Sequence, residues 1–246
     1  MKKQLLYLII GLFFTLNSFA NNHLEESDHN PINDGPYILK VNNKLKVNWI
    51  ENNVFREDYI RPDNYTQIKE NFNLIFNYND LTDTYLLKPN HNQSYKRIDS
   101  IGIISDVHGE YSIYIDLLKA MGIIDNNLNW KFGKGHFVVL GDTFDRGSMV
   151  TEVLWHLFGL EKQAAKAGGM VHVLLGNHEF MVLRKNLYDI NEKYRKVEAI
   201  SNTNYFDLYS KHSVLGKWLR SKSVVNYSYW HVKITCLYDN KIVSAQ

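Results

Sequence analysis

The segment VVLGDTFDRGSM, from Val138 to Met149, decides the fold class, because it passes directly from an apolar run into a cluster of charged residues. Asp142 and Asp145 stand three positions apart in it, with Arg146 and Gly147 beside the second aspartate. Charge directly after a buried strand is expected where the strand ends at the mouth of a crevice. The segment therefore predicts a strand whose carboxyl end carries a polar site.

Two more apolar runs are each followed by a polar cluster. Ile101–Ile104 precedes Ser105–Gly109, and Met170–Leu175 precedes Gly176–Glu179. A helical pattern follows each of the first two clusters: one ends at Gly122 and the next stops before Gly168. Strands that alternate with helices predict an α/β fold with a parallel sheet, and its carboxyl edge would collect all three clusters.

Composition limits the class of protein. The chain has 246 residues, of which 45% are hydrophobic and 22% charged, so it can bury one sizeable core. The formal net charge is only +2, without a concentrated basic face, which argues against a nucleic-acid partner. Cys236 is the single cysteine, and this excludes an intrachain disulfide framework and a thiolate metal cluster.

Residues 1–20 have the features of a signal peptide. Two lysines precede an apolar run from Leu5 to Leu16, and Ser18 to Ala20 forms a small-x-small cleavage signal. The run is shorter than the ~20 residues that a bilayer-spanning helix needs. The sequence predicts a periplasmic or secreted protein that leaves the membrane after cleavage; an uncleaved anchor helix is the alternative.

Residues 21–96 are predicted to form a polar leader and an N-terminal extension. A β-hairpin is expected from Tyr37–Val41 and Leu45–Trp49, with Asn42 and Asn43 in the turn. The rest, residues 51–97, has weak periodicity and is expected to be irregular.

The residue types in the polar clusters point to hard divalent metals. Asp106, His108, Asp142 and Asn177 offer oxygens and an imidazole, which suit Mn, Fe or Zn. Residues two apart in an extended loop point the same way, so Asp106 and His108 can meet one ion. Asp142 is placed to bridge to a second ion, to which Asn177 would also bind. Two such ions would activate a bridging water for attack on a phosphoester.

Three further residues are predicted to act on the substrate. Arg146 carries a planar guanidinium that matches phosphate oxygens. His178, oriented by Asp145, is a candidate to protonate the leaving oxygen. Glu179 is expected to support the loop or the start of the next helix, and His136, His156 and His172 are expected to be packing or surface residues.

The three clusters together resemble the calcineurin-like metallophosphoesterases, and especially the phosphoprotein-phosphatase branch, whose pattern is GDxHG, GDxxDRG and GNHE. Ser105 replaces the first glycine; the other signature positions match in the same order. The segment DGPY from Asp34 to Tyr37 makes the chain look most like bacterial Shewanella-like protein phosphatases. The resemblance implies a β-α-β sheet core, part of a four-layer α/β/β/α sandwich, with an N-terminal β-hairpin extension.

The resemblance also implies roles for individual residues. Asp106 and His108 with Asp142 would bind the first of two divalent ions, and Asp142 with Asn177 would form part of the second site. The implied catalytic residues are Asp145, Arg146 and His178. The implied activity is hydrolysis of phosphomonoesters on a phosphorylated protein, a peptide or a small molecule.

Downstream of the third cluster, the sequence no longer follows the family pattern. Members of the family take two more histidines for the second metal, the first from an HGG or HAG motif, whereas only His212 and His231 follow His178 here, and neither precedes a glycine. We therefore expect residues 97–222 to be the N-terminal half of the core, truncated at its C-terminus, and residues 223–246 to be an atypical tail that is out of register. Three alternatives remain open: an inactive truncated fragment, a dinucleotide polyphosphate hydrolase, and a non-enzymatic binding protein.

Overall fold

The computed structural model describes residues 30–82, 94–95, 98–223, 227–228, 234–238 and 241–245. The predicted signal peptide and the predicted leader up to residue 29 lie outside these residues. Among the described residues, no helix combines the length and the apolar character that a membrane span needs.

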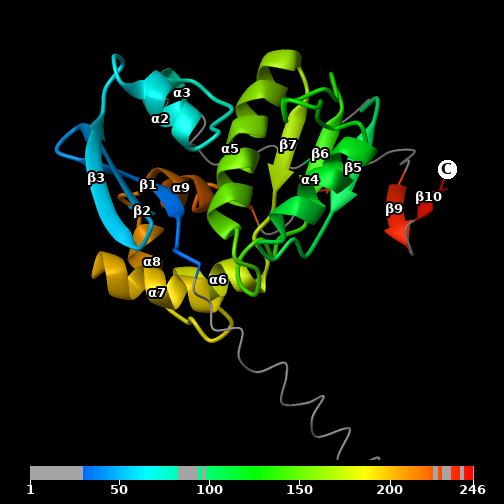
Figure 1. Ribbon diagram of the computed structural model, residues 1–246. Helices are drawn as coiled ribbons and strands as arrows, with labels where there is room; N and C mark the ends of the chain where they lie inside the picture. The colour runs from blue at the N-terminus through cyan, green and yellow to red at the C-terminus, as the bar shows by residue number, and fades with distance from the viewer. Residues whose placement is uncertain are drawn as a thin grey trace, which may run out of the picture. The chain divides into compact units, whose positions relative to one another are not determined.

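A parallel sheet of three strands carries the site. Its strands are β5 (Ile101–Ile104), β6 (His136–Val139) and β7 (Met170–Val173), in the order β5-β6-β7 (Figure 1). Ile104 pairs with Val139, and Val139 pairs with Val173. Because these pairs place the last residues of the three strands side by side, the three polar clusters leave the sheet at one edge. The predicted parallel arrangement is confirmed.

Helices follow the first two strands as the sequence predicts. Helix α4 spans Tyr111–Ala120, and α5 spans Val150–Ala167. Gly122 follows α4 with φ +69°, and Gly168 caps α5 with φ +78°, a conformation that glycine adopts without a steric penalty. Twelve of the eighteen residues of α5 are buried, too many for a helix with one covered face. Helix α5 is packed on two sides, by β7 and by β1.

The predicted N-terminal hairpin is present as part of a larger sheet. Strands β1 (Asp34–Val41) and β2 (Lys44–Glu51) pair antiparallel. Asn42 and Asn43 join them, with φ of +48° and +59°, values that asparagine tolerates better than most residues.

The prediction that residues 51–97 are irregular was wrong for most of the part that the structure describes. Strand β3 (Val54–Ile60) pairs with β2 after a second Asn-Asn turn, and helices α2 (Tyr65–Asn71) and α3 (Tyr78–Thr82) follow. Five of the seven residues of β3 are exposed, so this strand lacks the alternation of buried and exposed residues by which a strand is recognised in sequence.

Helices also follow the third strand of the parallel sheet. They are α6 (Asn177–Leu183), α7 (Glu192–Ser201), α8 (Tyr205–Leu208) and α9 (Val214–Leu219). The remaining strands are short: β4 (Ser94–Tyr95), β8 (Tyr227–Ser228), β9 (Ile234–Tyr238) and β10 (Lys241–Ala245).

The N-terminal sheet shares one hydrophobic core with the parallel sheet. Trp155 of α5 stacks on Phe76, with ring centroids 5.4 Å apart, and its Nε1–H donates a hydrogen bond of 2.7 Å to the carbonyl of Pro36. Lys193 of α7 forms an ion pair of 2.6 Å with the buried Asp34 of β1. The extension is therefore an integral part of the folded unit.

The Trp155 hydrogen bond gives a test of this junction. Trp155→Phe is expected to lower the free energy of unfolding by about 1–2 kcal/mol, because the Pro36 carbonyl loses its buried donor. Trp130→Phe is the matched control: its Nε1–H donates to Gly133 at an exposed position, where water can replace it. Urea unfolding measures the free energy of unfolding of both variants. Equal losses in the two variants would contradict the prediction that the Trp155 hydrogen bond stabilises the junction.

Candidate functional site

The loops after β5 and β6 contain several residues in a backbone conformation that is uncommon outside glycine. Positive φ values occur at Asp106 (+54°), His108 (+45°), Asp142 (+55°), Asp145 (+70°) and Arg146 (+62°). Each such residue costs of order 1 kcal/mol or more and persists only where its surroundings hold it in place. Such a concentration of strained residues is typical of functional sites.

Backbone hydrogen bonds between the two loops hold this conformation. His108 N donates to Asp142 O at 2.9 Å, and Gly147 N donates back to His108 O at 2.8 Å. Gly109 N also donates to Thr143 O at 3.0 Å. The motifs after β5 and β6 therefore form one interlocked structure.

Glu179 joins the third loop to the second. Its buried carboxylate accepts hydrogen bonds from the backbone N–H groups of Asp142 (2.9 Å), Thr143 (2.7 Å), Phe144 (3.3 Å) and Gly176 (2.7 Å). It also accepts from the Thr143 hydroxyl at 2.6 Å. The sequence predicted that Glu179 supports the loop or the helix start, and the structure shows that it does both.

His108, Asp142 and His178 form a cluster that suits a metal ion. One potential ligand atom from each lies within 4.8 Å of the others. His108 Nδ1–H donates to the carbonyl of Phe144 at 2.7 Å, which leaves the Nε2 lone pair for a ligand. Such an orienting hydrogen bond is a common feature of metal-binding histidines. Nε2 lies 3.9 Å from Asp106 Oδ1, so the predicted pair Asp106 and His108 comes together.

His178 is oriented by Asp145, as predicted. The two side chains make a hydrogen bond of 2.8 Å between His178 Nδ1 and Asp145 Oδ2, and both are buried. Burial raises the pKa of the Asp145 carboxyl above its ordinary value, and the hydrogen bond with His178 opposes that shift. With Nδ1 engaged, Nε2 is the ring nitrogen that remains for a ligand. His178 also donates its backbone N–H to Asp142 Oδ1 at 3.2 Å.

The other two predicted site residues are exposed. Asn177 is the first residue of α6, and Arg146 stands in the loop after β6. A loop that the sequence did not single out supports Arg146: its backbone N–H donates to Asp189 O at 3.0 Å, and its carbonyl accepts from Asn191 Nδ2 at 2.7 Å. Asn and Asp are common in any loop, so nothing in the sequence marked these two residues.

The remaining histidines of the described chain lie away from this cluster. His156 accepts from Tyr114 OH and donates to the Leu128 carbonyl, and burial lowers its pKa to about 4. His172 is hydrogen-bonded to His136, and burial lowers its pKa to about 3. These three pack in or beside the core, as expected.

His212 is exposed in a turn, and its carbonyl accepts from Lys40 N. His231 lies outside the described residues.

Gly176 gives a test of how closely the loops must approach. A Cβ at this position would clash with the Asp142 carboxylate and lie 2.8 Å from the Asp142 backbone nitrogen. Gly176→Ala is therefore expected to displace Asp142 and to weaken Mn²⁺ binding about 10- to 100-fold, the range for residues that position metal ligands. Titration with Mn²⁺ measures the affinity. Gly122→Ala, where a Cβ meets nothing within 4 Å, is the control; equal weakening in both would contradict the prediction.

Comparison with protein families gives an independent result. The family model described as calcineurin-like phosphoesterase matches residues 99–242, more than half of the chain. This match covers all three polar clusters, and it also runs past residue 222 into the segment that was predicted to be an atypical tail.

Individual relatives carry phosphatase names. The chain is 30% identical over 115 residues to Shewanella-like protein phosphatase 2 of Arabidopsis thaliana. The matched region makes up 47% of this chain and 27% of the relative. It is 29% identical over 133 residues to Shewanella-like protein phosphatase 1 of Plasmodium berghei. This matched region makes up 54% of this chain and 36% of the relative. The chain thus spans about a third or less of the length of these relatives.

A solved structure shares the fold. The crystal structure of a cold-active protein-tyrosine phosphatase from a psychrophilic Shewanella species superposes with a TM-score of 0.67 at 35% identity. The match covers 78% of this chain and 57% of that chain. The α/β fold predicted from the sequence is confirmed by this likeness.

Proposed function

Because the chain belongs to the calcineurin-like phosphoesterase family, we propose that it hydrolyses phosphomonoesters, with phosphorylated Tyr, Ser or Thr residues of proteins or peptides as its substrates. The observation that carries the proposal is the cluster of His108, Asp142 and His178 at the carboxyl edge of the parallel sheet. The names of the relatives, which are protein phosphatases, support the substrate class.

The donor set fits divalent cations. Asp106, His108, Asp142 and Asn177 would hold two ions of Mn, Fe or Zn, since they supply carboxylate and amide oxygens and an imidazole nitrogen that is already oriented by Phe144. Such ions lower the pKa of bound water and neutralise charge that develops on a phosphoryl group.

The chain's own side chains would bind the substrate and transfer a proton. The exposed guanidinium of Arg146 is suited to two phosphate oxygens at once. His178 Nε2 is suited to donate a proton to the leaving oxygen, while Asp145 holds Nδ1–H and stabilises the imidazolium. The strained loops and Glu179 fix these groups in advance, so little reorganisation is needed during the reaction.

The test compares the chain with and without metal. Protein dialysed against EDTA is given Mn²⁺, and bound Mn²⁺ per chain, thermal stability and turnover of p-nitrophenyl phosphate are measured. We expect two ions per chain and Mn²⁺-dependent turnover; at 100 times the dissociation constant, one bound ion would stabilise the fold by about 2.7 kcal/mol. Retention of no ion together with no turnover would overturn the proposal.

Substrate competition separates the enzymatic alternatives. Phosphotyrosyl and phosphoseryl peptides are expected to be better substrates than a diadenosine polyphosphate. The reverse preference would identify a dinucleotide polyphosphate hydrolase instead.

We also propose export to the periplasm or the medium, on the basis of residues 1–20. Expression with the native N-terminus is expected to give an exported protein whose N-terminus begins after Ala20. Protein retained in the cytoplasm with an intact N-terminus would contradict export.

A further inference from the structure

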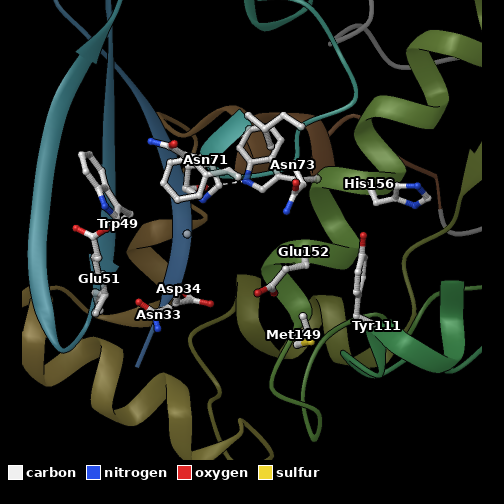
Figure 2. Close-up of a pocket in the computed structure, with 16 residues that line it drawn as sticks. Asn33, Asp34, Trp49, Glu51, Asn71, Asn73, Tyr111, Met149, Glu152 and His156 are labelled. Atoms are coloured by element: carbon white, nitrogen blue, oxygen red, sulfur yellow. Dashed lines mark hydrogen bonds between the residues drawn. The ribbon is translucent and has the colours of Figure 1, made fainter. Parts of the chain in front are cut away.

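A second concave site lies near the loops that follow β5 and β6, between the N-terminal sheet and helix α5. It is a cavity of about 650 Å³ lined by residues of β1 and β2, by the segment 71–74 and by one side of α5. Figure 2 shows Asp34 and Glu152 pointing toward each other across it, with Glu51 on the strand side. None of the predicted metal ligands lines this cavity.

The cavity is close to the metal site along the chain. Tyr111 lines it and stands three residues after His108, and Met149 lines it and stands three residues after Arg146. Three residues of extended chain span at most about 11 Å. Met149 N also donates to Gly109 O at 3.1 Å, which ties the cavity wall to the first metal loop. An extended peptide with its phosphate at the metal site would therefore reach the cavity with a side chain about three residues away.

The charge of the cavity is negative. Its lining residues include Asp34, Glu51 and Glu152, and no lysine or arginine. Lys193 pairs with Asp34 at 2.6 Å and with Glu152 Oε1 at 3.9 Å, and Arg56 pairs with Glu51 at 3.6 Å. Two cations thus meet three carboxylates, and the one carboxylate in excess favours a cationic ligand.

Glu152 offers an acceptor that lacks a donor. Its Oε2 atom is buried and accepts no hydrogen bond from the part of the chain that the structure describes. Burial raises the pKa of Glu152 to about 7, against the opposing effect of Lys193. A buried carboxylate oxygen without a donor is unfavourable, and a ligand that brings N–H groups to it would relieve this.

Aromatic rings complete the lining. Trp49, Phe72, Tyr111 and Trp155 are among the wall residues. Aromatic faces attract guanidinium and ammonium groups and also pack against their aliphatic stems. We propose that this cavity binds an arginine or lysine side chain of the phosphopeptide substrate, about three residues from the phosphorylated one. This inference rests on the proposed function for its substrate class.

The kinetic test uses two phosphotyrosyl peptides that differ at one position. The first has Arg three residues from the phosphotyrosine, on either side, and the second has citrulline, which has nearly the same shape and no charge. We expect kcat/KM to be about tenfold higher for the Arg peptide, in line with one favourable charged contact. In Glu152→Gln the ratio should fall toward one. A wild-type ratio near one, or an unchanged ratio in Glu152→Gln, would overturn the proposal.

The matched control is Asp116→Asn on α4, which removes an exposed carboxylate that does not line the cavity. This variant should keep the full ratio between the two peptides. If it lowers the ratio as much as Glu152→Gln does, the preference comes from the overall charge of the protein, and the cavity is not its source. Circular dichroism of both variants shows whether they are folded.

A binding measurement separates this inference from the proposed function. Nα-acetyl-arginine amide is titrated into metal-free protein, with the citrulline amide as control, and NMR shifts of tryptophan indole N–H groups are followed. We expect a dissociation constant on the order of 1 mM for the arginine amide, and weaker binding in Glu152→Gln. If the chain hydrolyses no phosphoester but binds in this way, the proposed function fails and the cavity assignment stands. If neither amide binds, the cavity assignment fails.

Discussion

Asp142→Asn is expected to lower Mn²⁺-dependent turnover of p-nitrophenyl phosphate by about a thousandfold, which corresponds to about 4 kcal/mol of activation free energy. The Asp142 carboxylate lies with His108 and His178 in the only cluster of three such groups found among the described residues. Asparagine has the same shape but no negative charge, so it cannot hold a cation as strongly. Steady-state rates over a range of Mn²⁺ concentrations check the prediction.

The variant should fold, because the hydrogen bond from His178 N to Asp142 Oδ1 can also be accepted by an asparagine oxygen. Asp116→Asn removes the same charge from an exposed position on α4 and should keep its activity. A second readout is independent of turnover: Asp142→Asn should retain fewer Mn²⁺ ions per chain after dialysis. Equal rates for the wild type and Asp142→Asn would remove Asp142 from the mechanism.

Glu179→Ala is expected to lower the free energy of unfolding by about 3–5 kcal/mol, the range for removing one partner of a buried charged interaction. The Glu179 carboxylate accepts from four backbone N–H groups and one hydroxyl, and alanine would leave these donors without it. Each orphaned buried donor is unfavourable, and three of the four backbone donors belong to the loop after β6, which contains residues at positive φ. Urea unfolding measures the loss.

Glu179→Gln gives a more specific test, because glutamine has nearly the same shape as glutamate but cannot accept hydrogen bonds at both ends of its side chain. Donors surround both oxygens: Thr143 and Phe144 donate to Oε1, and Asp142 and Gly176 donate to Oε2. Whichever way the amide is turned, its NH₂ group would face backbone N–H groups. We expect a loss of about 2–3 kcal/mol, whereas Glu70→Gln, at an exposed site of α2, should change stability by less than about 0.5 kcal/mol. A Glu179→Gln protein as stable as the wild type would show that this carboxylate does not organise the loops.

The sequence by itself determined the elements that position the site. Runs such as Ile101–Ile104 and Met170–Val173 are apolar enough to be buried in any arrangement, and Gly122 and Gly168 end their helices through local backbone geometry. The order of strand, polar cluster and helix then fixes which edge of a parallel sheet carries the clusters. For this reason Asp106, His108, Asp142, Asp145 and His178 could be predicted to lie near one another at this edge.

Only the tertiary structure decided how distant segments complete the site. Strand β3 is mostly exposed and carries no clear pattern, so its place became evident only from its pairing with β2. The number of hydrogen bonds to Glu179 and the support of Arg146 by Asp189 depend on loops that are far apart in the sequence. The same holds for the cavity, whose walls come from the N-terminal sheet and from α5. The local sequence pattern shows which side chains are buried. Which residues they contact in the core depends on how the whole chain packs.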